Sequence, residues 1–282
     1  MPVFSTPEPI SATVDIVLGT ARIVASDRTD TVVEVRPSRA GNSADVKAAE
    51  QTRVEFSNGV LLVKAPKQYG FFTRAGSIDV VVELPAGSDL RAEAAAGKFQ
   101  CEGRFGEGRI ATASGDIRIE EGRTLRLETS SGDIAVERAV GHTKVTGAGD
   151  LRIREIDGTA EIKNIAGQTW VGDVSGDVRL SSAAGDIVVD RAGSGVRAKT
   201  ASGDIRLGEV VRGSVTLETA SGELEVGIGQ GTAAWLDTTS MAGTVRNHMA
   251  ESDGPGRSDE TVEVRARTFH GDIVIRRAVA AD

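Results

Sequence analysis

The hexapeptide Ser114-Gly115-Asp116-Ile117-Arg118-Ile119 decides the fold, because close copies of it return along the chain. Residues 131–136 read Ser-Gly-Asp-Ile-Ala-Val, and further copies start at Gly149, Gly185, Gly203, Gly222 and Gly271, with weaker ones at Gly97, Gly167 and Gly243. The spacings between successive glycines are 18, 17, 17, 18, 18, 18, 19, 21 and 28 residues. A period this constant indicates stacked structural repeats.

Each repeat predicts two strands. After the glycine, apolar residues such as Ile117 and Ile119 alternate with polar ones such as Arg118, which is the two-residue period of a half-buried strand. About nine residues after many repeat glycines, a second glycine such as Gly141 or Gly158 opens another alternating run. One repeat therefore contains two short strands and two turns.

A unit of this size cannot bury its own apolar face, so each strand must pair in parallel with its counterpart one coil further on. We therefore expect an all-β fold: a parallel β-solenoid, right-handed and β-helix-like, of about ten coils of 17–19 residues with two short strands each. The half-period of nine excludes left-handed helices of hexapeptide repeats. The calcium-binding nonapeptide solenoid requires Gly-Gly-x-Gly-x-Asp, whereas this chain has one Gly-Asp per coil.

The periodicity also predicts how the chain is organised. Residues 1–95 are expected to form irregular N-terminal strands and capping coils, 96–246 the regular solenoid, 247–260 a surface loop, and 261–282 the last coil with a C-terminal tail. In the N-terminal part we expect loops at Pro37–Thr52 and Pro66–Ser77 and strands at Thr13–Leu18, Ala21–Ala25, Thr31–Arg36, Arg53–Phe56, Val60–Lys64 and Ile78–Leu84.

Charge and composition narrow the function classes. The 33 Lys and Arg against 41 Asp and Glu give a net charge of −8, with both signs interspersed, which disfavours nucleic acid and anionic membranes. No basic leader and no run of about 20 apolar residues is present, so we expect no membrane insertion and a cytoplasmic location, with a surface location only by an unrecognised export route. The single cysteine, Cys101, is interpreted as a small apolar filler.

The acidic residue after the repeat glycine has two interpretations. It is a turn residue that starts the next strand, or part of a carboxylate column that gathers cations. We favour the turn, because stacked like charges repel, while cation binding stays open. The predicted turn pairs are Gly115 and Asp116, Gly132 and Asp133, Gly149 and Asp150, Gly185 and Asp186, Gly203 and Asp204, and Gly271 and Asp272.

Two groups of aromatic residues are candidate partner contacts. Trp170 falls at an outward strand position, and Tyr69, Phe71 and Phe72 cluster in one loop. The register of Trp235 is left open. The outward arginines are interpreted as a mixed solvated face, because Ala, Trp, Val and Glu share their position; they are Arg118, Arg152, Arg206 and Arg246.

No catalytic, cofactor or metal pattern is found. His142, His248 and His270 lack metal-ligand spacing, and the Ser-Gly pairs lack a Gly-x-Ser-x-Gly elbow. The glycines, which recur about every nine residues, do not lead into a helix as a phosphate loop does. We expect a chain that is not an enzyme and needs no cofactor.

The repeated Ser-Gly-Asp-Ile-x-Ile units, the strand Gly158–Asn164 with its Gly-x-Ala-x-Ile-x-Asn pattern, and the turn Asp27-Arg28-Thr29-Asp30 followed by Val32-Val33-Glu34-Val35 resemble the putative-adhesin, or toast-rack, family of bacterial proteins. The resemblance is to its stand-alone actinobacterial type. It implies a right-handed β-solenoid of unknown function, without a known cofactor or active site, and an envelope-related role.

These observations favour a non-enzymatic scaffold or protein-interaction module that binds a protein partner or associates with itself through end coils or a face. One alternative is a surface adhesin that binds glycan or host protein. A further alternative is a polysaccharide lyase or hydrolase on a parallel β-helix, for which coils of 17–19 residues leave little room for active-site loops. The partner, the process and the oligomeric state stay open.

Overall fold

The computed structural model describes residues 1–66, 75–250 and 260–279. The chain is built almost entirely of β-strands and divides into two compact units, 1–140 and 141–282, which are described separately below. Parallel pairing between equivalent strands of successive coils dominates both units, which confirms the expected parallel β-solenoid. Among the residues described, no helix has the length and apolar character that crossing a membrane requires.

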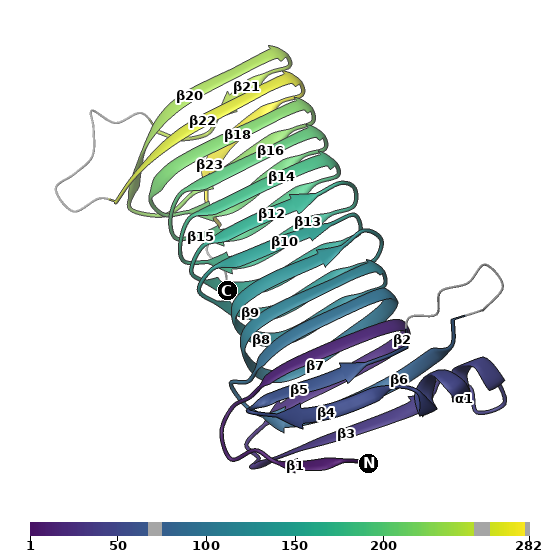
Figure 1. Cartoon of the computed structure of the whole chain (residues 1–282). Coiled ribbons are helices and arrows are strands. Elements are labelled where there is room, and N and C mark those ends of the chain that lie inside the picture. Colours follow the sequence, from purple (N-terminus) through teal and green to yellow (C-terminus); the bar gives the residue numbers. More distant parts are fainter. Residues whose placement is uncertain (67–74, 251–259, 280–282) are drawn as a thin grey trace. The chain divides into compact units, whose positions relative to one another are not determined.

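Each regular coil of unit 141–282 contributes one strand to each of two parallel stacks of strands, here called face A and face B (Figure 1). Face A precedes the Gly-Asp turn and consists of β10 (Thr143–Gly147), β12 (Ala160–Asn164), β14 (Val178–Ala184), β16 (Val196–Ser202), β18 (Gly213–Ser221), β20 (Thr232–Ala242) and β22 (Glu260–His270). Face B follows it and consists of β11 (Leu151–Asp157), β13 (Thr169–Val174), β15 (Ile187–Ala192), β17 (Ile205–Val210), β19 (Leu224–Ile228), β21 (Val245–Asn247) and β23 (Ile273–Arg277).

The core lies between the two faces and is made of in-register apolar columns. On face A, Leu180 of β14 pairs with Ala198 of β16, which pairs with Leu217 of β18, and all three are at most 1% exposed. Alternation along each strand sends every second residue inward, so an unchanged register stacks apolar on apolar from coil to coil. The period seen in the sequence is thus the period of this column.

The corner between the faces is held by backbone contact. Gly203 adopts φ +138°, and a Cβ atom there would lie 2.3 Å from the carbonyl oxygen of Gly185 in the preceding coil. Beneath the corner, the buried Thr219 hydroxyl donates a hydrogen bond of 3.1 Å to the carbonyl oxygen of Gly203, and Thr200 makes the same contact with Gly185 at 3.4 Å. This threonine column, which the repeat pattern alone did not indicate, satisfies the corner carbonyls inside the core.

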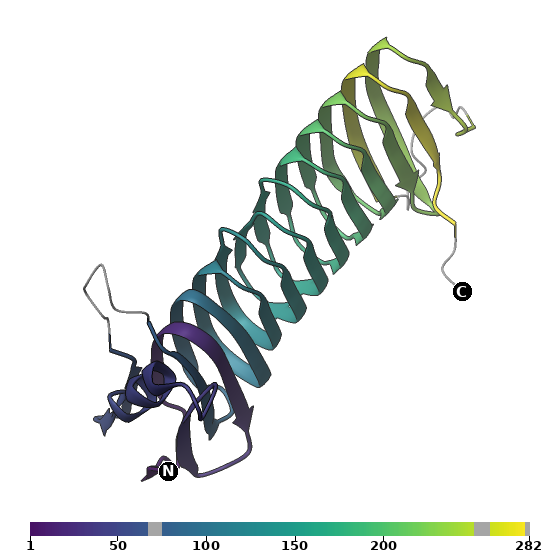
Figure 2. The same cartoon turned by 90° about the vertical axis from the view of Figure 1, so that its right-hand side faces the viewer.

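The last two coils depart from sequence order. We expected each coil to stack on the one before it, but β22 pairs with β18 on one side and with β20 on the other. On face B, β23 likewise lies between β19 and β21 (Figure 2). The end coil of this unit, β20 with β21, therefore comes earlier in the sequence than the coil of β22 and β23, which lies between it and the coil of β18 and β19.

Unit 1–140 combines parallel coils with antiparallel edges. Its elements are β1 (Val3–Ser5), β2 (Ser11–Ser26), β3 (Asp30–Pro37), α1 (Ser43–Glu50), β4 (Arg53–Ser57), β5 (Val60–Lys64), β6 (Ser77–Pro85), β7 (Asp89–Ser114), β8 (Ile117–Thr129) and β9 (Ile134–Val140). The long strand β2 forms a whole coil, paired in parallel with β7 on one side and with β5 and β6 on the other. Beyond these lie the antiparallel strands β4, β3 and β1.

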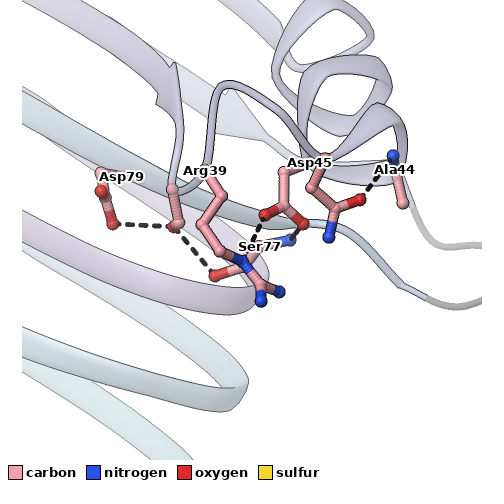
Figure 3. Close-up of polar contacts among 7 residues, drawn as sticks. Arg39, Ala44, Asp45, Ser77 and Asp79 are labelled. Carbon is pink, nitrogen blue, oxygen red and sulfur yellow. Dashed lines mark hydrogen bonds and ion pairs between the residues drawn. The ribbon is translucent and has the colours of Figure 1, made fainter.

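The segment Pro37–Thr52, which we expected to be a loop, contains helix α1. The Asn42 side chain caps the helix by accepting a hydrogen bond of 2.9 Å from the N–H of Ala44. The buried Asp45 carboxylate accepts hydrogen bonds from the N–H of Ser77 at 2.9 Å and from Arg39 at 3.3 Å (Figure 3). These tertiary contacts fix the short helix against β6, which its weak amphipathic pattern did not reveal.

The corner geometry makes Gly203→Ala destabilising. The new methyl group would meet the Gly185 carbonyl, and the corner would hold alanine at a positive φ. We therefore expect the free energy of unfolding to fall by about 1–3 kcal/mol or more, with a lower melting temperature. Gly41→Ala is the matched control, because nothing lies within 4 Å of its Cβ position and its φ is not positive. Equal melting temperatures for the two variants would contradict the corner contact.

The Cys101 thiol is 3% exposed within β7, and burial raises its pKa. Because the thiolate is the reactive form, we expect almost no reaction of the native protein with a disulfide reagent at pH 8 and one modified thiol per chain after unfolding in urea. Rapid native labelling would show that β7 opens locally around Cys101.

Candidate functional site

The repeat aspartates bridge neighbouring coils through the backbone. Asp186 Oδ1 accepts a hydrogen bond of 2.9 Å from the N–H of Asp204, and Asp204 Oδ1 accepts one of 2.7 Å from the N–H of Glu223. The same contact joins Asp116 to Asp133, Asp150 to Gln168, and Asp272 to Thr244. The glycines before the repeat aspartates lie at these turns. Within the described ranges, no group of three or more His, Cys, Asp or Glu side chains is placed to hold a metal ion.

Trp170 occupies an outward position of β13 and is half-buried. Its ring lies 5.1 Å, centroid to Cζ, from the guanidinium of Arg152, the residue directly opposite it in β11. A Cβ on Gly172 would lie 3.2 Å from the far edge of the ring, so the indole lies along its own strand over this glycine. The contact with Arg152 is of the cation–π type and covers part of the indole.

The other predicted outward arginines differ in their surroundings. Arg206 pairs with Glu225 at 3.0 Å, and Arg246 pairs with Asp272 at 2.9 Å. Arg118 lies between Gln100 and Ala135 in the register of unit 1–140. This is the mixed face that the sequence indicated.

The remaining predicted residues are not brought together. Tyr69, Phe71 and Phe72 lie outside the described residues. The open register of Trp235 is resolved: it is an outward residue of β20, opposite Glu263, and 58% exposed. The histidines His142, His248 and His270 are exposed, and His142 Nδ1 lies 3.0 Å from the Thr159 hydroxyl.

The structure reveals a cationic column on face A that the sequence analysis missed. It occupies the outward position before the central buried residue of each strand. Its members are Lys144, Glu161, Arg179, Arg197, Thr216 and Arg265 in unit 141–282. Within unit 1–140, Arg109 of β7 and Arg126 of β8 are opposite each other at the equivalent strand position. The available signal was the pair Val178-Arg179-Leu180 and Val196-Arg197-Ala198, 18 residues apart.

Arg179 and Arg197 are uncompensated in this column. They are directly opposite each other in β14 and β16, and both are exposed. The backbones of neighbouring strands lie about 4.8 Å apart. Neither guanidinium has a hydrogen bond or ion pair with another of the described residues. Neighbouring cations on face A do: Lys199 pairs with Glu218 at 3.3 Å, and Arg267 with Asp237 at 3.4 Å. Like charges directly opposite each other destabilise a sheet, so this arginine pair is unfavourable for the stability of face A.

The nearest carboxylate in the column is held elsewhere. Glu161 is opposite Arg179 in register, but its carboxylate oxygens accept from Lys163 at 2.9 Å and Lys144 at 3.0 Å. These hydrogen bonds, that of Lys163 first, lower the pKa of Glu161 to about 2. Glu161 is therefore ionised and paired with its lysines at neutral pH, and it does not bond to Arg179.

An open hollow surrounds the arginine pair. Besides Arg179 and Arg197, its lining includes Glu161, Ser194, Ser214 and Thr216. Asp177 at its rim accepts hydrogen bonds from the Ser194 hydroxyl at 2.7 Å and the Gly195 N–H at 3.0 Å, which lower its pKa. Two adjacent guanidinium groups form a surface that can receive an anionic group with two or more acceptor oxygens.

A protein-family model matches most of the chain. The family model of Toastrack DUF4097 matches residues 21–276. No curated protein matches the chain.

Among solved structures, a putative adhesin from Bacteroides fragilis is 11% identical, with a TM-score of 0.38 and coverage of 97% of this chain and 95% of that one. A putative lipid binding protein from Parabacteroides distasonis is 10% identical, with a TM-score of 0.48 and coverage of 97% and 95%. A putative adhesin from the same organism is 12% identical, with a TM-score of 0.27 and the same coverage.

Family membership therefore rests on the family match, which spans the whole repeat region and most of the N-terminal strands, and agrees with the Ser-Gly-Asp units that suggested it. The chain belongs to the Toastrack DUF4097 family.

Proposed function

We propose that this protein is a non-enzymatic scaffold that binds a carboxylate-rich segment of a protein partner on face A, centred on Arg179 and Arg197. The observation that carries the proposal is the uncompensated arginine pair in a sheet whose neighbouring cations are paired with carboxylates. A ligand carboxylate between the two guanidinium groups would accept charge-assisted hydrogen bonds and relieve their mutual repulsion.

The geometry suits a docking surface. Arg179 and Arg197 project from the middle of a sheet whose inward residues are fully packed, so their backbone positions are fixed before a partner arrives. Preorganised donors reduce the ordering cost of binding. The rim aspartate, Asp177, is engaged by Ser194 and Gly195, which leaves the arginines to meet the incoming charge.

A surface adhesin is the second candidate, because uronate carboxylates of an acidic glycan offer the same acceptor geometry to the arginine pair. The two candidates differ in location. We place the scaffold in the cytoplasm, and cell fractionation with an antibody against the chain tests this: recovery from the cell surface would favour the adhesin.

Binding to poly-L-glutamate, measured by calorimetry at low salt, tests the arginine pair. The double variant Arg179→Gln/Arg197→Gln should weaken binding at least tenfold, about 1.4 kcal/mol, because it removes both charge-assisted donors. Arg206→Gln is the control, since this arginine lies on face B and is paired with Glu225. Equal losses in both variants would refute a site on face A, and tighter binding of polygalacturonate than of poly-L-glutamate would favour the glycan.

Glu161→Gln should act in the opposite direction. Removing this carboxylate frees Lys144 and Lys163 beside Arg179, so affinity for poly-L-glutamate should rise several-fold and the salt dependence should steepen. Circular dichroism would check that the variant keeps its strands. Unchanged or lower affinity would mean that the anion does not bind at this part of face A.

A further inference from the structure

The end coil of unit 141–282 has one unpaired side. Within the described residues, β20 pairs only with β22, and β21 pairs only with β23. At the opposite edge of each strand, the backbone N–H and C=O groups therefore meet no other strand of the described ranges. Such edges are templates for pairing with another strand.

This coil also leaves the core open. Leu236 of β20 pairs with Val264 of β22, and Val264 pairs with Val215 of β18. Val264 and Val215 are fully buried, whereas Leu236 in the same inward column is only half-buried. One further coil in this column would bury Leu236 as completely as its neighbours.

Apolar side chains gather at the same place. Trp235 is 58% exposed, Met241 72% and Val245 41%, and all three lie on β20 or β21. Terminal repeats of a solenoid normally carry a polar outer face that keeps the protein soluble. In unit 1–140, by contrast, the whole-coil strand β2 is paired on both sides, and antiparallel strands lie beyond it.

The usual devices that protect an edge are missing from β20. It contains no Lys, Arg or Pro, and its single charge, Asp237, is paired with Arg267 of its own neighbouring strand at 3.4 Å. On β21, Arg246 is likewise paired with Asp272 at 2.9 Å. The edge thus offers no uncompensated charge to an approaching strand.

We propose that this edge is an interface between two copies of the chain, in which β20 pairs antiparallel with β20 of the second copy about a two-fold axis. An antiparallel edge is complementary to itself, and a two-fold contact closes after one addition, so the product is a dimer. With the axis perpendicular to the faces, β21 meets β21 of the second copy in the same way, and both open columns are covered.

Charge and side-chain packing together favour one register. An axis at Asp237 would set the two Asp237 carboxylates directly opposite each other, which is unfavourable. An axis at Thr238 instead places Asp237 opposite Thr239 of the second copy and Trp235 opposite Met241. This register opposes no like charges and brings indole and thioether together, a favourable contact.

The first test is the oligomeric state of the full chain by light scattering and sedimentation equilibrium. The wild type should be a dimer at micromolar concentration, and Trp235→Lys/Met241→Lys should raise the dimer dissociation constant at least tenfold. Ile165→Lys is the matched control, because Ile165 is 63% exposed but lies in a turn away from β20. Circular dichroism confirms that the variants are folded.

The second test is the register. Thr238→Cys would place two cysteines opposite each other across the axis, with Cα atoms about 4.5–5.5 Å apart, within disulfide range. We expect an oxidised dimer on a non-reducing gel, whereas Thr216→Cys on face A should give none, and the buried Cys101 should not contribute. A monomeric wild type, a dimer unaffected by the lysine variant, or equal cross-linking at positions 216 and 238 would overturn the proposal.

Discussion

The closeness of one glycine corner to the next is the constraint on which the rest of the structure depends. A side chain at Gly203 would meet the Gly185 carbonyl at 2.3 Å, so only glycine allows successive coils to approach at strand spacing there. Once the corners are stacked, the strands on both sides pair in register, and alternation turns the apolar residues into continuous columns. The threonine hydroxyls beneath the corners and the aspartate carboxylates above them satisfy backbone groups that the turn leaves free.

This architecture separates stability from recognition. Inward residues and corners hold the coils, while outward residues change from coil to coil without disturbing the ladder. On face B the outward charges are largely compensated, and Trp170 is partly covered by Arg152. On face A the Arg179–Arg197 pair is not compensated, since Glu161 bonds to its two lysines. A flat, rigid ladder that carries an uncompensated pair of arginines is suited to docking an acidic segment.

The end coil differs from the regular coils because one of its edges is unpaired among the described residues. Because β22 and β23 insert beneath it, β20 and β21 carry both the open edge and three exposed apolar side chains, those of Trp235, Met241 and Val245. Each strand of a solenoid can form backbone hydrogen bonds with one further strand. The edge of the last strand must therefore be covered or paired with another chain. The antiparallel strands of unit 1–140 cover this edge at β2, whereas a second copy of the chain would pair with it at β20.

The sequence by itself determined the solenoid, its period, the two strands per coil and the family, because glycine corners and alternating apolar residues are local signals that repeat. Strands β3, β4, β5 and β6 were also predictable from alternation, whereas Thr13–Leu18 and Ala21–Ala25, expected as two strands, form the single strand β2. Tertiary structure decided the rest. Helix α1 depends on contacts of Asp45 with Ser77 and Arg39, which the local pattern does not encode. The order of the last coils follows from pairing between distant strands. The arginine pair emerged only when register placed two residues 18 positions apart side by side and showed that Glu161 was already bonded elsewhere.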